Sequence, residues 1–302
     1  MSMPPSGVVI RAHAKINLDL RVLGRRRDGY HDLRTVFQAV ALHDTLVCVR
    51  RPGAFALDSP RPGIPLDERN LVWQAAAALW KWAGRTGTAD GVSVRLEKRI
   101  PVQAGLGGGS SDAAAALVAL ARLWDLAVPA DGLHDLASTL GSDVAFFLEG
   151  GTAVGGGRGE HLVRLADIGP VWVVLAQPPA GIPTADAYGW FDADRGLAPG
   201  ERRDVMEAWA GLGDVSVNDL EAPVLARHPE IRLLKQRLIA AGAARAAMSG
   251  SGSAVFGLFD DRATADEARR GLAAEGFWSV LTRTLAGVEY ARRSRARACR
   301  PA

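Results

Sequence analysis

One stretch near the middle of the chain, PVQAGLGGGSSDAAAAL at residues 101–117, has the composition of an anion-binding loop. Its glycines allow positive φ angles and close approach of a ligand, and its serines supply hydroxyl donors. The helix expected to begin at Ser110 or Ser111 would turn unpaired N–H groups and the positive end of its dipole toward a phosphate. Ser110, Ser111 and Asp112 are the expected N-cap residues. The stretch therefore favours phosphate binding over the alternative of an ordinary strand–turn–helix connection.

This loop matches none of the three common glycine-rich motifs. A P-loop that began at Gly105 would need a glycine at Ser110 followed by a lysine, and neither is present. The same serine excludes the dinucleotide-binding motif G-x-G-x-x-G. Asp112 stands where a nucleophile elbow built on Ser110 would need its last glycine. A second glycine run, at residues 154–160, is flanked by strand-like segments and predicts a hairpin.

The bulk composition is typical of a globular protein with a substantial core. The chain has 302 residues, of which 48% are hydrophobic and 23% charged. Its apolar runs are shorter than the roughly 18 residues that a membrane span requires, and its first residues lack the pattern of a signal peptide. Cys48 and Cys299 provide no disulfide framework and fit a reducing compartment. We therefore expect a cytoplasmic protein without a membrane partner.

The formal net charge of +3 comes from one end of the chain. Residues 291–302 carry five arginines and no acid, and the chain without them has a net charge of −2. A broad basic face for nucleic acid is therefore not expected, and the basic tail at residues 288–302 is expected to be disordered. Only four of the 36 basic residues are lysines, so a lysine in an apolar segment indicates a need for a compact ammonium group.

Hydrophobic periodicity predicts an α+β fold with two lobes, residues 1–165 and 166–287, which join near residues 159–177. The predicted strands lie at residues 7–24, 44–50, 92–100, 152–165, 171–178, 253–259 and 278–285. The predicted helices lie at residues 68–84, 110–124, 132–141, 143–150, 202–212, 218–242 and 261–276. Asn70 is the expected N-cap of the first helix, and Asp28-Gly29 predicts a turn after the first strand.

Three segments together resemble the motifs of the GHMP kinase superfamily, in the order found there. They are AHAKINLDLRVLGRRRDGYHDL at residues 12–33, the glycine-rich loop, and MSGSGSAVFGLF at residues 248–259. The lysine–asparagine strand followed by DGYH resembles, more narrowly, the CDP-methylerythritol kinases, which are ATP-dependent kinases of the non-mevalonate isoprenoid pathway. LGSDVAFF, IPTADAY and NDLE are similar to that family as well, so the resemblance extends to about Gly287.

The resemblance implies a ribosomal-protein-like N-terminal lobe, a ferredoxin-like C-terminal lobe and an active site between them. It places catalysis on Lys15 and Asp143, although Asp143 could instead cap the short helix after Gly141. Magnesium would bridge the β- and γ-phosphates of ATP; its protein ligands are unknown, with Ser111 and Asp112 both open. The residues implied to hold ATP are Pro101, Gly105, Leu106, Gly107, Gly108, Gly109, Ser110 and Ser111.

The resemblance also implies a site for a cytidine diphosphate conjugate. Tyr30 would stack on the cytosine opposite Tyr188, and His31 would hydrogen-bond to it. Asn17 and Thr184 would lie near the substrate, and Gly250, Ser251 and Gly252 would face its phosphates. The plainer alternatives are an exposed strand residue for Asn17, a hairpin aromatic for Tyr30, a packed imidazole for His31 and a tight turn at residues 249–253.

The resemblance implies a kinase that phosphorylates the 2-hydroxyl of the methylerythritol part of CDP-methylerythritol, with ATP and Mg²⁺. A mevalonate or homoserine kinase of the same superfamily is an alternative, but those acceptors have no base for Tyr30 and Tyr188 to stack on. A non-catalytic nucleotide sensor is another alternative, but it would not need both Lys15 and Asp143. We expect a monomer or a weak homodimer.

Overall fold

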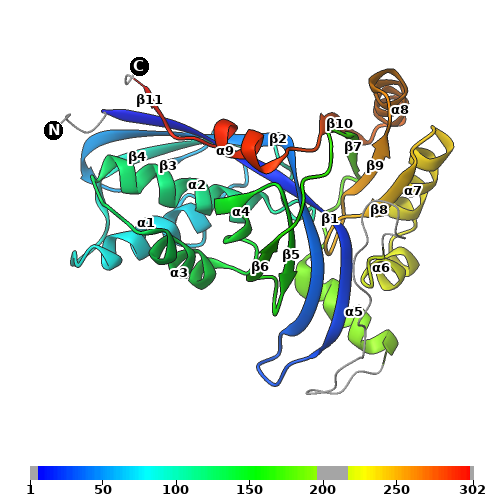
Figure 1. The fold of residues 1–302 in the computed structure, drawn as a ribbon, viewed down its shortest axis with the longest axis horizontal. Coiled ribbons are helices and arrows are strands. Elements are labelled where there is room, and N and C mark those ends of the chain that lie inside the picture. The colour runs from blue at the N-terminus through cyan, green and yellow to red at the C-terminus, as the bar shows by residue number, and fades with distance from the viewer. Residues whose placement is uncertain (1–5, 196–216, 300–302) are drawn as a thin grey trace.

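The computed structural model describes residues 6–195 and 217–299 (Figure 1). Within these ranges the strands form two sheets, and the fold is α+β as predicted. The first sheet has the order β11-β1-β2-β4-β3, with β5 beside β2 and β6 beside β5; the second has the order β10-β7-β9-β8. The strands are β1 (Gly7–Arg25), β2 (His31–Ala54), β3 (Ala56–Asp58), β4 (Asp90–Glu97), β5 (Thr152–Gly156), β6 (His161–Arg164), β7 (Trp172–Gln177), β8 (Arg245–Met248), β9 (Val255–Phe259), β10 (Trp278–Arg283) and β11 (Arg297–Cys299).

The helices pack on the sheets in two groups (Figure 1). α2 packs on β1 and β2 of the first sheet and α1 and α3 pack on α2, whereas α7 and α8 lie against the second sheet. The core of the first group is closely packed because α2 presents a run of buried alanines that lets α1 and β1 approach it. The helices are α1 (Leu71–Trp82), α2 (Gly108–Leu123), α3 (Ala130–Leu140), α4 (Phe146–Glu149), α5 (Thr184–Arg195), α6 (Glu221–Arg227), α7 (Pro229–Ala240), α8 (Arg262–Ala274) and α9 (Gly287–Arg293).

The long antiparallel pair β1–β2 joins the two halves of the molecule. It runs in register from Gly7 opposite Val49 to Arg25 opposite His31, with irregularities on either side of Lys15. Near its first end it packs in the core with α1 and α2, whereas its middle forms a separate apolar core with β7 and β9 of the second sheet. The strand that carries Lys15 therefore lies where the two sheets meet.

The structure corrects the predicted start of α2. The helix begins at Gly108 rather than at Ser110 or Ser111, and its N-cap is Gly107, whose φ of 69° is in the left-handed region. None of the predicted cap side chains acts as a cap, because no side chain caps this helix. The hydroxyl of Ser111 donates instead to the carbonyl oxygen of His13 at 2.7 Å, which ties α2 to β1. Glycine supplies the αL conformation without strain, so the backbone alone forms the turn.

The prediction of a disordered basic tail is wrong for residues 288–299. Residues 288–293 lie in α9 and residues 297–299 form β11, which pairs with the start of β1. Tyr290 explains the order, because its ring is buried against Gly150 and its hydroxyl donates to the carbonyl oxygen of Phe147 at 2.7 Å. Arginine charge is also neutralised locally, since Glu289 pairs with Arg283 and Arg293. Burial of an aromatic ring outweighs the tendency of a charged end to remain in water.

The remaining segment predictions agree with the described residues in part: the helix predicted at residues 218–242 is two helices, α6 and α7, on either side of His228, and β8 and the first half of β2 are not predicted. Asn70 caps α1 by accepting a hydrogen bond from the N–H of Val72, and the glycine run at residues 154–160 forms the β5–β6 hairpin. The lobe boundary predicted after residue 165 lies between β6 and β7. The helix predicted at residues 202–212 lies outside the described residues. No helix in the described ranges has the length and hydrophobicity to cross a membrane.

Candidate functional site

A cleft of about 930 Å³ lies between the glycine-rich loop, the middle of β1 and the start of α5. It is lined by every predicted site residue except Ser111 and Gly252. Ser111 is buried behind the loop, and Gly252 packs toward Met248 on the far side of its own loop. The three motifs, which are far apart in the sequence, thus meet around one cavity.

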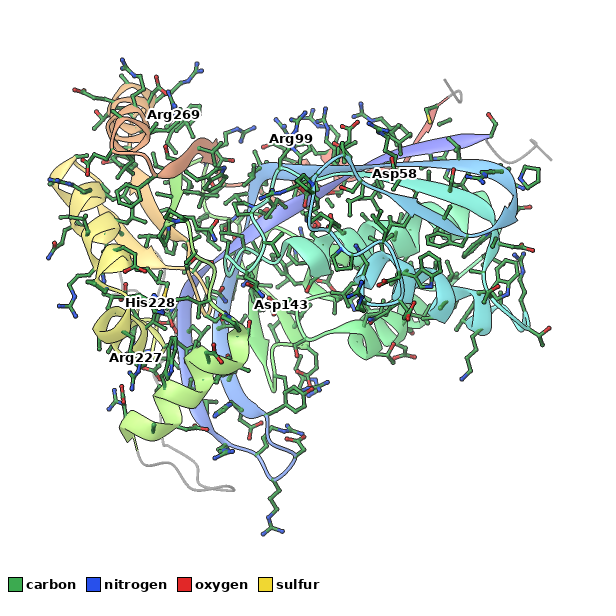
Figure 2. All side chains as sticks on the ribbon, turned by 180° about the vertical axis from the view of Figure 1, so that it is seen from behind. Asp58, Arg99, Asp143, Arg227, His228 and Arg269 are labelled. Carbon is green, nitrogen blue, oxygen red and sulfur yellow. The ribbon has the colours of Figure 1, made fainter. Side chains whose placement is uncertain are left out.

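Lys15 and Asp143 face each other inside this cleft. The ammonium of Lys15 lies 3.3 Å from Oδ2 of Asp143, and the Lys15 side chain is almost fully buried whereas that of Asp143 is 30% exposed. Figure 2 shows Asp143 near the centre of the molecule, where the two halves meet. The helix-cap alternative for Asp143 does not hold, since the N-cap of α4 is Ala145 and no side chain caps it. The carboxylate is therefore paired with a cation and partly open to the cavity.

Asn17 holds Lys15 in place and links it to the other motifs. Its Oδ1 accepts a hydrogen bond from Lys15 Nζ at 2.6 Å, and its Nδ2 donates to Thr35 on β2 at 2.7 Å. Its backbone N–H donates to the hydroxyl of Ser249, which in turn donates to the carbonyl oxygen of Gly105. Asn17 is thus buried in the site rather than exposed on a strand. One serine connects β1, the glycine-rich loop and the loop at residues 249–253.

The glycine-rich loop is shaped by close contacts that only glycine permits. Gly105 and Gly107 both have positive φ, and a Cβ at Gly105 would lie 1.9 Å from the carbonyl oxygen of Ser249. A Cβ at Gly107 would lie 2.5 Å from the ring of Phe147. Because α2 has no side-chain cap, the N–H groups of its first turn at Gly108, Gly109 and Ser110 are not used by a capping side chain. Such a helix N-terminus, opening on a cleft, is suited to bind phosphate.

The other end of the cleft carries the aromatic and histidine side chains. The rings of His31 and Tyr188 stack with their centroids 4.7 Å apart, and Nε2 of His31 lies 2.8 Å from Oδ1 of Asp192 on α5. Burial raises the pKa of Tyr188, so its hydroxyl stays protonated. Tyr30 is 54% exposed, and the guanidinium of Arg158 lies over its ring at 4.9 Å. The stacking partner of Tyr188 is thus His31, and the partner of Tyr30 is an arginine.

The loop at residues 249–253 forms the wall between the two ends. Asn218 donates from Nδ2 to the carbonyl oxygens of Met248 and Gly250, at 2.8 Å each, and thereby fixes the loop from behind. Thr184, at the start of α5, lies 3.2 Å from Ser251 through their hydroxyl oxygens. The NDLE segment therefore serves the site without lining the cleft.

Several residues of the cleft are not identified from the sequence. Arg158 lines it from the β5–β6 hairpin, and Asp192 lines it from α5. Asp192 has no local signal, because its position near His31 depends on tertiary packing. Lys98 lines the cleft beside the loop and is held by two buried aspartates. The scarcity of lysine in this chain is the one signal that singles out Lys98.

Near the start of α1, the cleft is lined by apolar side chains. They include Ile64, Leu71 and Leu96, with the polar Arg69 and Asn70 beside them. The side-chain amide of Asn70 is already hydrogen-bonded: it donates to the carbonyl oxygen of Pro65 and accepts from the N–H of Val72 at the start of α1. A flat aromatic base fits such a surface, since stacking and apolar contact need little charge. Among the described residues there is no group of three His, Cys, Asp or Glu side chains placed to hold a metal ion.

Comparison with known proteins agrees with this arrangement. The GHMP kinases N terminal domain family matches residues 70–151, and the GHMP kinases C terminal family matches residues 202–277. The chain is 44% identical over 259 residues to the 4-diphosphocytidyl-2-C-methyl-D-erythritol kinase of Symbiobacterium thermophilum, covering 84% of this chain and 91% of that protein. It is 42% identical over 286 residues to the kinase of the same name from Moorella thermoacetica, covering 92% and 99%. A crystal structure of 4-(cytidine 5'-diphospho)-2C-methyl-D-erythritol kinase superposes with a TM-score of 0.73 at 36% identity, covering 92% of this chain and all of that one.

Proposed function

Because this chain belongs to the GHMP kinases and, among them, to the 4-diphosphocytidyl-2-C-methyl-D-erythritol kinases, it is an ATP-dependent kinase of isoprenoid precursor biosynthesis, and we propose that Lys15 and Asp143 carry out its phosphoryl transfer. The acceptor is the 2-hydroxyl of 4-diphosphocytidyl-2-C-methyl-D-erythritol. The observation that carries the proposal is the pairing of Lys15 with Asp143 at 3.3 Å inside the cleft that the three motifs share.

The transfer needs a base for the hydroxyl proton and positive charge around the γ-phosphate. Asp143 takes the proton of the acceptor hydroxyl while the oxygen forms its bond to the γ-phosphorus and the bond to the β–γ bridging oxygen breaks. Lys15 holds the carboxylate of Asp143 in an ion pair before the transfer and neutralises phosphate charge during it. Asn17 holds the ammonium of Lys15 in position through its 2.6 Å hydrogen bond.

The two substrates enter from opposite ends of the cleft in this proposal. The triphosphate of ATP lies on the N–H groups at the start of α2, with its adenine on the apolar side chains near the start of α1. The cytosine lies among Tyr30, His31 and Tyr188, and the guanidinium of Arg158 neutralises the diphosphate that follows it. Mg²⁺, when bound, neutralises the β- and γ-phosphates, and phosphate oxygens and water would supply most of its ligands.

Location and assembly belong to the proposal as well. We place the enzyme in the cytoplasm as a monomer or weak homodimer that acts on a small molecule, without a nucleic-acid or membrane partner. The weakly acidic body of the chain supports the absence of a nucleic-acid partner.

A turnover assay tests the activity. Purified protein is incubated with ATP, Mg²⁺ and 4-diphosphocytidyl-2-C-methyl-D-erythritol, and the product is followed by phosphorus NMR and by coupled ADP release. Parallel reactions contain mevalonate or homoserine in place of the conjugate. We expect turnover with the cytidine conjugate alone. Turnover on mevalonate or homoserine, with none on the conjugate, would contradict the proposed acceptor.

The variant Asp143→Asn tests the role of the carboxylate. We expect kcat to fall by a factor of about a hundred or more while ATP still binds, because the amide cannot accept the hydroxyl proton. Asp131→Asn, a change at an exposed residue of α3, is the matched control and should leave kcat as in the wild type. A kcat of Asp143→Asn close to that of the wild type would remove Asp143 from the chemistry.

A further inference from the structure

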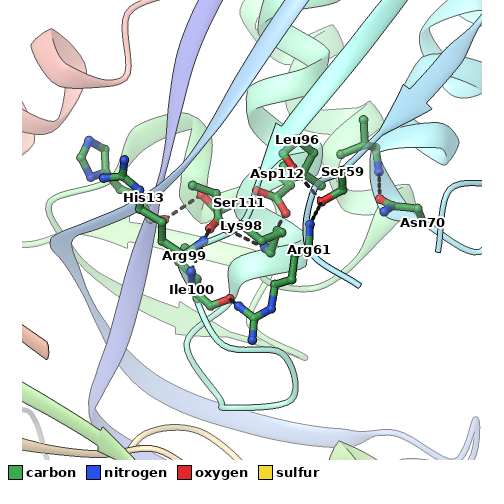
Figure 3. A network of polar contacts seen from close by, with 12 residues as sticks. His13, Ser59, Arg61, Asn70, Leu96, Lys98, Arg99, Ile100, Ser111 and Asp112 are labelled. Carbon is green, nitrogen blue, oxygen red and sulfur yellow. Dashed lines mark hydrogen bonds and ion pairs between the residues drawn. The ribbon is translucent and has the colours of Figure 1, made fainter. Parts of the chain in front are cut away.

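Three charged side chains are buried together beside the glycine-rich loop. The ammonium of Lys98, just after β4, donates to Oδ2 of Asp112 on α2 at 2.7 Å, and Figure 3 shows these two side chains side by side. The same ammonium also pairs with Asp44 on β2. The side chains are 5%, 3% and 0% exposed for Lys98, Asp112 and Asp44. This cluster, Lys98–Asp44–Asp112, takes no part in the proton transfer described above.

The cluster joins the two ends of the loop. Oδ1 of Asp44 accepts hydrogen bonds from the backbone N–H groups of Arg99 and Ile100, immediately before the loop begins at Pro101. Asp112 lies on α2, one turn after the helix begins at Gly108 and immediately after the loop ends. Lys98 therefore connects the chain that enters the loop with the helix that leaves it. A single ammonium group sets the separation of these two segments.

The loop backbone passes close to this ammonium. A Cβ at Gly108 would lie 3.2 Å from Nζ of Lys98 and 2.9 Å from Cγ2 of Ile100, so the first residue of α2 rests directly on the cluster. Gly108 is also one of the residues whose N–H groups open on the cleft. A shift of Lys98 would therefore move the N–H groups that the proposed function assigns to the phosphates of ATP.

Fold stability alone does not account for such a cluster. Replacing buried ion pairs by apolar side chains is often neutral or stabilising. Burial acts to lower the pKa of Lys98, but the two carboxylates outweigh burial and raise it, so the ammonium stays charged. Burial raises the pKa of Asp112, and the charge of Lys98 acts against this rise.

We propose that Lys98 is a positioning residue for ATP, which joins Asp44 to Asp112 and so directs the N–H groups at the start of α2 toward the phosphates. The proposal rests on the proposed function, since it assumes that ATP occupies this loop. Lys98 differs from Lys15 in its role, because Lys15 pairs with Asp143 whereas Lys98 acts through the loop. A compact ammonium fits between two carboxylates where the planar guanidinium of arginine does not, which explains a lysine in an arginine-rich chain.

The experiment measures KM for each substrate, kcat and the thermal midpoint in three variants. Lys98→Met removes the ammonium, and we expect KM for ATP to rise tenfold or more while KM for the cytidine conjugate stays within about twofold. Lys98→Met with Asp112→Leu also removes the carboxyl that loses its partner, so we expect its thermal midpoint to recover while KM for ATP stays high. Lys81→Met, at an exposed position on α1, is the matched control, with both KM values as in the wild type.

Two outcomes would overturn the proposal. One is a folded Lys98→Met protein with the KM for ATP of the wild type. The other is a double variant that regains both its thermal midpoint and its KM for ATP, which would show that the cluster serves folding alone. If Lys98→Met does not fold, KM for ATP of the double variant alone decides whether Lys98 positions ATP. Calorimetry of the wild type with the magnesium complex of adenylyl-imidodiphosphate tests the ATP site separately from the role of Lys98. If this complex does not bind to the wild type, the proposed ATP site itself is refuted.

Discussion

A histidine in the core of the first sheet predicts how the protein loses stability in acid. His13 lies on β1 with its ring fully buried, 5.0 Å from the ring of His43 and 5.6 Å from that of Tyr290. Burial, with smaller contributions from His43 and nearby arginines, lowers the pKa of His13 from 6.5 to about 3. The perturbation is a change from pH 7 to pH 5, applied to the wild type and to His13→Leu.

The magnitude follows from proton linkage. The unfolded chain binds a proton at His13 near pH 6.5, whereas the folded protein does so only near pH 3. The folded-state pKa is therefore depressed, and stability is fully present above pH 6.5 and falls as the pH decreases toward 3. One pKa unit corresponds to about 1.4 kcal/mol, so His13 alone removes about 2 kcal/mol of unfolding free energy between pH 7 and pH 5.

The assay is urea unfolding followed by tryptophan fluorescence at both pH values. We expect His13→Leu to lose about 2 kcal/mol less than the wild type between pH 7 and pH 5. His43, whose pKa burial also lowers, is present in both proteins and so cancels in the comparison. His161→Leu is the control, since His161 is exposed and its replacement should keep the wild-type loss. Equal losses in the wild type and His13→Leu would refute the linkage reasoning.

Three further substitutions test the loop, the tail and the acceptor end. Gly107→Ala should lower the unfolding free energy by about 1–2 kcal/mol, because alanine disfavours positive φ, and it should also raise KM for ATP. Gly109→Ala should lower the unfolding free energy less, since its added Cβ meets its nearest neighbour at 3.6 Å. Tyr290→Ala should lower the unfolding free energy by about 3–5 kcal/mol through lost burial, whereas Val288→Ala, at an exposed residue, should change it by less than about 0.5 kcal/mol. Asp192→Ala should raise KM for the cytidine conjugate about tenfold, because it removes the carboxylate that holds the ring of His31. KM for ATP should stay as in the wild type. Chemical denaturation and steady-state kinetics check all three.

Much of the site follows from short segments of the chain. Local composition could locate the glycine-rich loop and the strand with Lys15 and Asn17. The family resemblance then implied that both lie around the same two ligands, ATP and the cytidine conjugate. The structure brings these residues to one cleft. Composition could not locate the start of α2, because capping serines and glycines are both common at helix starts. Close contact with Phe147 and Ile100 is what requires glycine at positions 107 and 108.

The tail and the Lys98 cluster show where local reasoning ends. Five arginines without an acid predict a disordered end, yet Tyr290 finds a buried place beside Gly150 that nothing in the tail itself reveals. Asp44, Lys98 and Asp112 come from three separate elements, and each taken alone is an ordinary charged residue. By itself the sequence predicted most of the elements, the place of the glycine-rich loop and the family, because these depend on residues close together in the chain. Tertiary structure alone decided which charges are buried together and which backbone passes within reach of a side chain, because burial and contact depend on distances between elements far apart in the sequence.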